Sequence, residues 1–314
     1  MVTTTAHDPQ TSGIPTSNGE TRRLLLTVSE NASHLYSVRF VSQFFSNTDK
    51  IDLTLLYITP PKTTPMVGPK GIRSGDMPMD EETIALREQQ GMDGMNAART
   101  ILGASGHDLN ALNANIRPQQ VSKVWDIINE GVTGRYDAII LGNRGRSRLD
   151  DILEGRVNVN REILENSCRA PLWICSEVAS DARNVLLCVD GSDAAYRMTE
   201  HVGDMLSIAP DQKVTLMRVT RESSIGPSDP HRIFTICMEL LRKRGVSEDR
   251  ISTKAVWDND VVGTILREAH HGGYAVVAAG RTGVGGGLMQ SLFMGSVAKA
   301  LFRKLSGAAL WVRC

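Results

Sequence analysis

The sequence predicts an α/β fold made of two successive doubly wound domains, each with a five-stranded parallel sheet. Short apolar runs of strand length alternate with longer segments of helical apolar spacing, the pattern expected of βαβ units. Three strand-like runs also recur in the same order in both halves: residues 22–28 with 183–189, 136–142 with 274–280, and 170–174 with 308–312. This recurrence indicates an internal duplication, and 314 residues suit two domains of about 150 residues each.

In the first half, strands are predicted near residues 24–28, 52–58, 109–116, 138–142 and 172–175. Helices are predicted between them, near residues 33–46, 81–104, 119–130 and 159–167. Successive parallel strands need right-handed crossovers, so these helices should cover both faces of the sheet. Residues 60–80 contain several prolines and glycines, which predicts a mobile surface loop there.

The second half repeats the pattern. Strands are predicted near residues 184–189, 213–220, 250–257, 275–279 and 309–313, and helices near 194–207, 229–244, 261–270 and 296–305. We therefore expect domains at residues 21–176 and 183–314, after a disordered N-terminus at residues 1–20. The connection at residues 176–182 is too short for free movement, so the domains should pack together as an intramolecular pseudo-dimer.

Composition excludes several classes of function. The chain has 35 basic and 35 acidic residues, so it has no overall field that would attract nucleic acid or an anionic membrane. No run has the apolar length of a transmembrane helix, and the first twenty residues lack the apolar core of a signal peptide, which predicts a cytoplasmic protein. The five cysteines do not form a Cys-x-x-Cys pair, so neither a disulfide framework nor a zinc site is expected.

Two strand ends in the second half, one followed by an acid and the other by a glycine-rich loop, indicate a ligand site. Asp190 follows an apolar strand, and the loop after Gly280 contains Gly283, three consecutive glycines and then Gly295 and Ser296, where a helix begins. Glycines allow close backbone approach, and a helix N-terminus favours an anion. Ligands of open α/β sheets bind outside the carboxyl ends of the strands, where both segments fall. Capping of the following helix is the alternative role for Asp190.

On these residues and motifs, the chain resembles the universal stress protein family in both halves. The resemblance implies a five-stranded α/β sheet and, for one class, ATP bound through the first-strand acid, here Asp190, and a Gly-x-x-Gly motif with a later Gly-Ser. It assigns the motif glycines to Gly280 and Gly283, and the adenine contact to the backbone of Val219. It further implies phosphate contacts at the run Gly295, Ser296 and Val297, and pairing through the fifth strand, which carries Trp173 or Trp311.

The chain departs from the family pattern in both halves. Eleven residues separate Gly283 from Gly295 where the family has nine, so the second loop must bulge. In the first half Ser29 stands at the position of Asp190, which leaves the acid missing or displaced to Glu30. The first-half loop keeps three glycines but has an arginine in place of Ser or Thr: Gly142, Gly145, Gly155 and Arg156. We therefore expect one competent site, in the second half, and a degenerate site in the first.

The remaining histidines, arginines and motifs do not indicate a further functional site. His201, His231, His270 and His271 lack the spacing of a metal site and are expected to face solvent. The arginines of the first-half loop alternate with acids, which favours a solvated mixed-charge loop or an ion-pair network over an anion site. Neither a Gly-x-Ser-x-Gly elbow nor a Walker-type Gly-Lys-Ser/Thr is present, so neither hydrolase chemistry nor a standard ATPase is supported.

The resemblance predicts a stress-response protein that binds ATP or a related adenine nucleotide, with Mg²⁺ on the phosphates, and signals to a protein partner. It would be a binding module, with ATP hydrolysis at most weak and no catalytic residue assigned. A nucleotide-independent scaffold with both sites degraded is an open alternative, as is a homodimer through the fifth strand. An adenylating enzyme of the same fold would need paired glycines after the first strand, which residues 190–193 lack.

Overall fold

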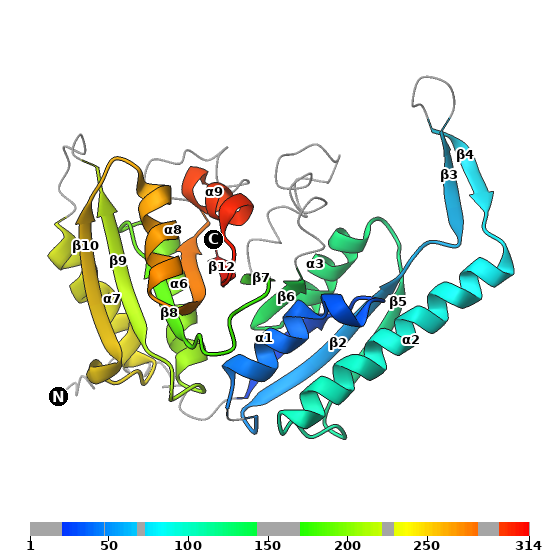
Figure 1. Cartoon of the computed structure of the whole chain (residues 1–314), viewed down its shortest axis with the longest axis horizontal. Coiled ribbons are helices and arrows are strands. Elements are labelled where there is room, and N and C mark those ends of the chain that lie inside the picture. The colour runs from blue at the N-terminus through cyan, green and yellow to red at the C-terminus, as the bar shows by residue number, and fades with distance from the viewer. Residues whose placement is uncertain are drawn as a thin grey trace, which may run out of the picture.

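The structure is a computed structural model that describes residues 21–46, 48–67, 73–142, 170–221, 229–281 and 295–313. Both halves supply five strands to one sheet (Figure 1). The first half contributes β1 (Arg22–Thr27), β2 (Ile51–Thr59), β5 (Asn113–Pro118), β6 (Ala138–Gly142) and β7 (Leu172–Cys175). The second contributes β8 (Asn184–Cys188), β9 (Val214–Thr220), β10 (Ile251–Trp257), β11 (Tyr274–Gly280) and β12 (Ala309–Arg313).

The strand order shows the same arrangement twice. Across the sheet the order is β5-β2-β1-β6-β7-β12-β11-β8-β9-β10, so each half places its third, second, first, fourth and fifth strands in sequence. Neighbours within each half pair in parallel, whereas β7 and β12 pair antiparallel. The predicted fold class, two five-stranded parallel-sheet units packed as a pseudo-dimer, is confirmed.

Helices cover both faces of the sheet, as predicted. One face carries α1 (Tyr36–Phe44), α2 (Glu81–Ala104), α6 (Asp193–Leu206) and α7 (Pro230–Lys243), and the other carries α3 (Lys123–Thr133), α8 (Val261–His271) and α9 (Ser296–Lys304). Within β1, Leu24 and Leu26 belong to the first core and Leu25 to the second, because successive strand residues point to opposite faces. Each core is continuous across the two halves.

Local hydrogen bonds set the helix starts more tightly than the apolar pattern predicted. The helix expected from residue 119 begins at Lys123, because Ser122 caps it by accepting the backbone N–H of Trp125 at 3.2 Å. The helix expected from residue 33 is preceded by a 3₁₀ turn, η1 (Ala32–His34), with Asn31 as its cap. A second 3₁₀ turn, η3 (Glu248–Arg250), occupies the predicted start of β10.

Two predictions for the first half are wrong in part. The strand expected from residue 109 begins at Asn113, because Asp108 accepts the backbone N–H of Asn110 at 2.8 Å and forms a turn. The stretch expected as a mobile loop contains a hairpin, β3 (Thr63–Val67) and β4 (Arg73–Pro78). This hairpin stands apart from the main sheet (Figure 1). Antiparallel pairing gives its backbone N–H and C=O groups partners.

The junction between the halves is built around two stacked tryptophans. Trp173 on β7 pairs with Trp311 on β12, and their rings stack at a centroid distance of 4.0 Å and an interplanar angle of 8°. Both side chains are fully buried, and Phe40 of α1 meets each of them edge-on. The expectation that Trp173 and Trp311 lie at the interface between the halves is therefore confirmed.

His201 of α6 completes this junction, which corrects the expectation that it faces solvent. The side chain is 2% exposed, and its Nε2 lies 2.9 Å from Nε1 of Trp173. Because the indole nitrogen can only donate, Nε2 of His201 must be the acceptor, so the imidazole is neutral. Burial, together with the charges of Arg313 and Arg22, holds the pKa of His201 well below its usual value. Of the other histidines in question, His231, His270 and His271 are exposed.

Polar side chains also join the two halves. Arg22 Nη2 lies 3.2 Å from Asp204 Oδ1, and both side chains are mostly buried. Asp204 also receives Arg244 Nη1 at 2.6 Å, so one carboxylate binds a cation from each half. Gln212 donates to the carbonyl of Phe44 at 2.5 Å. Breaking the Arg22–Asp204 pair would leave a mostly buried charge uncompensated, so this pair favours the observed placement of the two halves.

The two tryptophans should differ in their tolerance of substitution. Nε1 of Trp311 is buried without a hydrogen-bond partner among the described residues, whereas Nε1 of Trp173 donates to His201. Both Trp→Phe changes remove similar volume, but only Trp173→Phe breaks a buried hydrogen bond. We expect Trp173→Phe to lower the free energy of unfolding by about 1–3 kcal/mol more than Trp311→Phe. Urea denaturation of the two variants measures this difference, and equal losses would contradict it.

His201 should make the protein sensitive to mild acid. The unfolded chain takes up a proton near pH 6.5, the ordinary imidazole value, whereas the folded imidazole stays neutral to lower pH. Stability is therefore complete above pH 6.5 and falls as the pH drops from there towards the folded pKa, by up to about 1.4 kcal/mol per pH unit. His201→Gln keeps an acceptor for Trp173 without titrating. Its urea midpoint should fall less than that of the wild type between pH 7.5 and 5.

Candidate functional site

Six of the seven predicted nucleotide-site residues line one pocket of the second half. The pocket lies between the carboxyl ends of β8, β9 and β11 and the start of α9, and its volume is about 120 Å³. The predicted residues on its wall are Asp190, Val219, Gly280, Gly295, Ser296 and Val297. Gly283 lies outside the described residues. Segments more than a hundred residues apart are thus brought to one place, the edge at which open α/β sheets bind ligands.

Asp190 has a defined local role. Its Oδ1 accepts the backbone N–H of Ser192 at 3.0 Å and the Ser192 hydroxyl at 2.6 Å. Ser192 Oγ in turn accepts the backbone N–H of Ala195 at 3.2 Å and is the N-cap of α6. Gly191 makes the turn with a φ of 84°. The helix cap considered for Asp190 is therefore Ser192, and the half-buried carboxylate of Asp190 holds that cap in place.

Gly280 is needed for packing. A Cβ atom at this position would lie 2.8 Å from the backbone nitrogen of Ala195 and 2.9 Å from the carbonyl carbon of Ala194. The end of β11 therefore touches the backbone of the first turn of α6. This contact explains the glycine without any ligand, and it also places the end of β11 beside Asp190 on the pocket wall.

The start of α9 forms the polar side of the pocket. Gly295 is the N-cap residue, and its carbonyl accepts the backbone N–H of Lys299 at 2.9 Å, without a side-chain cap. Its own N–H donates to the carbonyl of Arg281 at 2.5 Å. The first turn of a helix leaves backbone N–H groups without intrahelical partners, and the helix dipole adds partial positive charge there. This end of the pocket suits an anionic group, with the exposed Ser296 as an additional donor.

Apart from Arg218, the rest of the wall is mostly apolar. Val219, Val261 and Ile265 line it, together with Ala279 and Met217. Cys188 also reaches this wall, and burial, with the charge of Asp190, raises its pKa to about 12. The thiol is therefore protonated at neutral pH and is not an activated nucleophile. The pocket combines a mostly apolar wall with one carboxylate, one arginine and one helix N-terminus.

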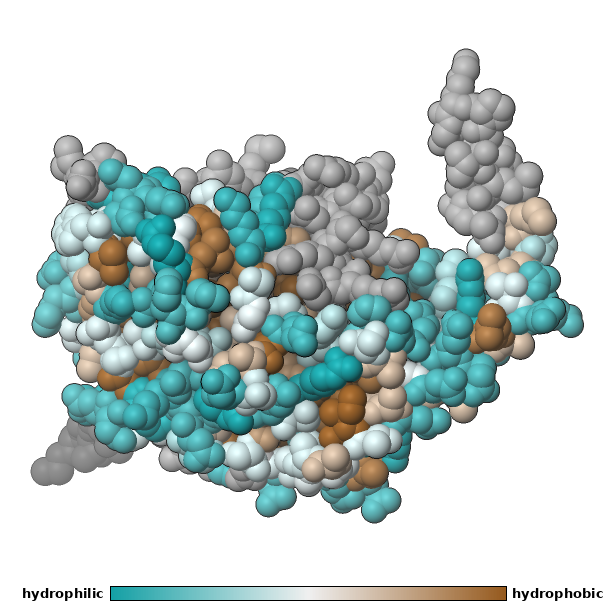
Figure 2. Space-filling model, in the orientation of Figure 1, coloured by the Kyte–Doolittle hydropathy of each residue, from teal (hydrophilic) through white to brown (hydrophobic). Residues whose placement is uncertain are grey.

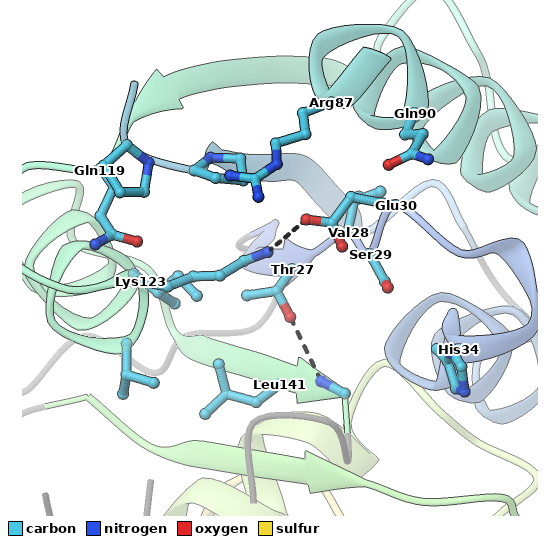
Figure 3. A pocket seen from close by; sticks show the side chains of 15 residues that line it. Thr27, Val28, Ser29, Glu30, His34, Arg87, Gln90, Gln119, Lys123 and Leu141 are labelled. Carbon is cyan, nitrogen blue, oxygen red and sulfur yellow. Dashed lines mark hydrogen bonds and ion pairs between the residues drawn. The ribbon is translucent and has the colours of Figure 1, made fainter. Parts of the chain in front are cut away.

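The first half has the larger cavity. It measures about 690 Å³ and lies at the carboxyl ends of β1 and β6, where Ser29 and Gly142 were expected to mark a degenerate site. Both residues line it. Gly145, Gly155 and Arg156, the other residues expected there, lie outside the described residues. Sequence reasoning missed the side chains that α2 and α3 bring to the cavity, namely Arg87, Gln90 and Lys123, shown in Figure 3.

Glu30 and Lys123 form an ion pair inside this cavity. Lys123 Nζ lies 3.4 Å from Glu30 Oε1, and the hydroxyl of Tyr57 donates to the same oxygen at 3.3 Å. Burial alone would raise the pKa of Glu30, but the charge of Lys123 and hydrogen bonds outweigh it and lower that pKa. Burial and the Glu30 charge raise the pKa of Tyr57 well above its ordinary value. Glu30 is therefore ionised and its charge is balanced.

Within the part of the chain that the structure describes, no group of three or more His, Cys, Asp or Glu side chains is placed to hold a metal ion. None of the described helices is both long and apolar enough to cross a membrane. The exposed face in Figure 2 is mostly hydrophilic, with hydrophobic residues in small separate groups.

The second half matches a known family model. The model of the universal stress protein family aligns with residues 182–313, which include β8 to β12 and every described wall residue of the small pocket. Residues 182–313 form a universal stress protein domain. No curated protein sequence matches the chain.

Solved structures extend the likeness to the whole fold. A universal stress protein from Archaeoglobus fulgidus is 13% identical, and the match covers 93% of this chain and 97% of that one with a TM-score of 0.60. A functionally unknown Pseudomonas aeruginosa protein is 14% identical over 93% of this chain and 92% of its own, with a TM-score of 0.46. A universal stress protein in complex with cAMP is 17% identical over 42% of this chain and 95% of its own, with a TM-score of 0.34.

The equivalent glycines of the two halves should respond differently to alanine. A Cβ at Gly142 would lie 3.4 Å from the nearest atom, the carbonyl oxygen of His34, whereas one at Gly280 would overlap the backbone of α6. We expect Gly280→Ala to lower the free energy of unfolding of the universal stress protein domain by about 1–3 kcal/mol. Gly142→Ala should change it by less than about 0.5 kcal/mol. Chemical denaturation of both variants tests this, and equal stability would contradict it.

Proposed function

We propose that the chain binds ATP or a related adenine nucleotide in its universal stress protein domain and acts as a binding and signalling module. The observation that carries this proposal is the meeting of Asp190, Gly280 and the start of α9 around one pocket. The apolar wall near Val219 would take the base, Asp190 a ribose hydroxyl, and the α9 N-terminus the phosphates. Mg²⁺ would reach the site on the phosphates, as magnesium commonly does.

The volume of the pocket adds a condition. Pockets that hold small molecules usually measure about 300–1,000 Å³, and this one measures about 120 Å³. A nucleotide would therefore have to widen it, and we expect the start of α9 to move, since Gly295 has no side chain and Ser296 is exposed. Occupancy would shift α9, which packs beside β12 at the junction between the halves. We propose that a protein partner recognises the shifted position of α9.

A nucleotide-independent scaffold is the second candidate. Two observations favour it: the small volume of the pocket, and the engagement of Asp190 with Ser192, which gives the carboxylate a structural role without a ligand. The two candidates differ in a single measurable property, nucleotide binding.

The conservative variant Asp190→Asn separates the two roles of this side chain. The amide oxygen can still accept both bonds from Ser192, while the charge that would strengthen a bond to a ribose hydroxyl is lost. We expect it to weaken ATP binding by about 10- to 150-fold, equivalent to about 1.5–3 kcal/mol. Its unfolding midpoint should match that of the wild type. Ser29→Ala, the equivalent position of the first half, should leave ATP affinity unchanged.

The measurement starts from purified native protein, denatured to release bound small molecules, which are identified by chromatography and mass spectrometry. About one ATP or ADP per chain, lost in Asp190→Asn and kept in Ser29→Ala, supports the proposal. An empty supernatant, together with no calorimetric response to ATP and Mg²⁺, supports the scaffold.

A further inference from the structure

The first-half cavity has the size and lining of a ligand site but lacks the nucleotide-site acid. At about 690 Å³ it lies within the usual range for small-molecule pockets, and none of its described wall residues belongs to the second half. Ser29 replaces the acid that stands at Asp190 in the other half. Its chemistry therefore has to be read from its own side chains.

The helix α2 forms one side of the cavity and supplies polar side chains to it. A Cβ at Gly91 would lie 2.2 Å from the Tyr57 ring, and one at Gly94 would lie 2.2 Å from the carbonyl oxygen of Ser29. These two glycines let the helix lie directly against β2 and the end of β1. Arg87 and Gln90, four residues and one residue before Gly91, are thereby placed on the cavity wall.

The charges in the cavity do not cancel. Glu30 is balanced by Lys123 at 3.4 Å. The Arg87 guanidinium has no acidic side chain within ion-pair distance among the described residues, although its backbone carbonyl accepts the Tyr57 hydroxyl at 3.5 Å. In Figure 3 the Arg87 side chain extends from α2 over the cavity. Its half-buried position leaves one net positive charge on a wall that also carries the amides of Gln90 and Gln119.

The opposite wall is apolar. Val124 and Ile127 of α3 and Leu141 of β6 form it, and Pro60 and Pro61 also line the cavity. A planar fork of donors beside an apolar wall matches a carboxylate or phosphate carried on an apolar body, because the guanidinium binds either group through two parallel hydrogen bonds.

We propose that the first-half cavity is a second binding site, distinct from the nucleotide pocket, for a small organic anion whose carboxylate or phosphate contacts Arg87. The apolar part of the ligand lies against Val124, Ile127 and Leu141, and Gln90 and Gln119 donate to its polar atoms. The Glu30–Lys123 pair holds the start of α3 against the end of β1 and keeps the cavity shaped in the absence of a ligand.

The test is isothermal titration calorimetry of the full chain at low salt with three probes of similar shape. Phenyl phosphate and benzoate represent the two anion types, and benzyl alcohol is the uncharged control. We expect one saturable site per chain for at least one anion and none for benzyl alcohol. The anion that binds more tightly identifies the head group.

Substitutions of Arg87 test whether the anion binds in this cavity. Arg87→Gln should weaken anion binding at least tenfold and Arg87→Lys by less, because lysine keeps the charge without the fork. Lys62→Gln is the matched control: it removes an exposed positive charge next to Pro61 in the chain and should change the affinity by less than twofold. Circular dichroism and the unfolding midpoint check that each variant folds. Absence of saturable binding for both anions, equal binding of benzyl alcohol, or unchanged affinity in Arg87→Gln would each overturn the proposal.

Discussion

The antiparallel pairing of β7 with β12, closed by the stack of Trp173 on Trp311, is the constraint on which the rest of the molecule depends. It converts two five-stranded sheets into one and makes both cores continuous. Stacked aromatic rings contribute more than their buried area alone, and here both rings are fully buried. The position of His201, the ion pair of Arg22 with Asp204 and the packing of α1 all follow from this junction.

The junction is not symmetric, although the fold on either side is. His201 of the second half accepts the indole N–H of Trp173, while Phe40 of the first half only packs edge-on against Trp311. The pocket of the second half and the cavity of the first half also differ from each other. The second half has an acid, a close-packed glycine and a small pocket, and the first half has an ion pair, Arg87 and a large cavity. The two pockets share no described wall residue, so two ligands would not compete for one site.

In both halves, a close backbone contact at a glycine determines which groups line the pocket or cavity. Gly280 permits β11 to touch the first turn of α6, and Gly94 permits α2 to touch the carbonyl of Ser29. In the first case the contact places the end of β11 beside Asp190 on the pocket wall, and in the second it places Arg87 on a cavity wall. A glycine in either place therefore has a packing cause that operates whether or not a ligand is bound.

The sequence by itself determined the fold class and the main strands of both halves, because apolar periodicity and an internal repeat depend only on the order of residues. The pairing of the two fifth strands was expected from the family resemblance. The sequence also determined which segments meet at the pocket of the universal stress protein domain. Only the tertiary structure decided the start of β5, the hairpin β3–β4 and the burial of His201, since each depends on a hydrogen bond that periodicity does not encode. The first-half cavity could not be predicted for a different reason: Arg87 and Lys123 are distant from Ser29 in the chain, and only helix packing brings them together.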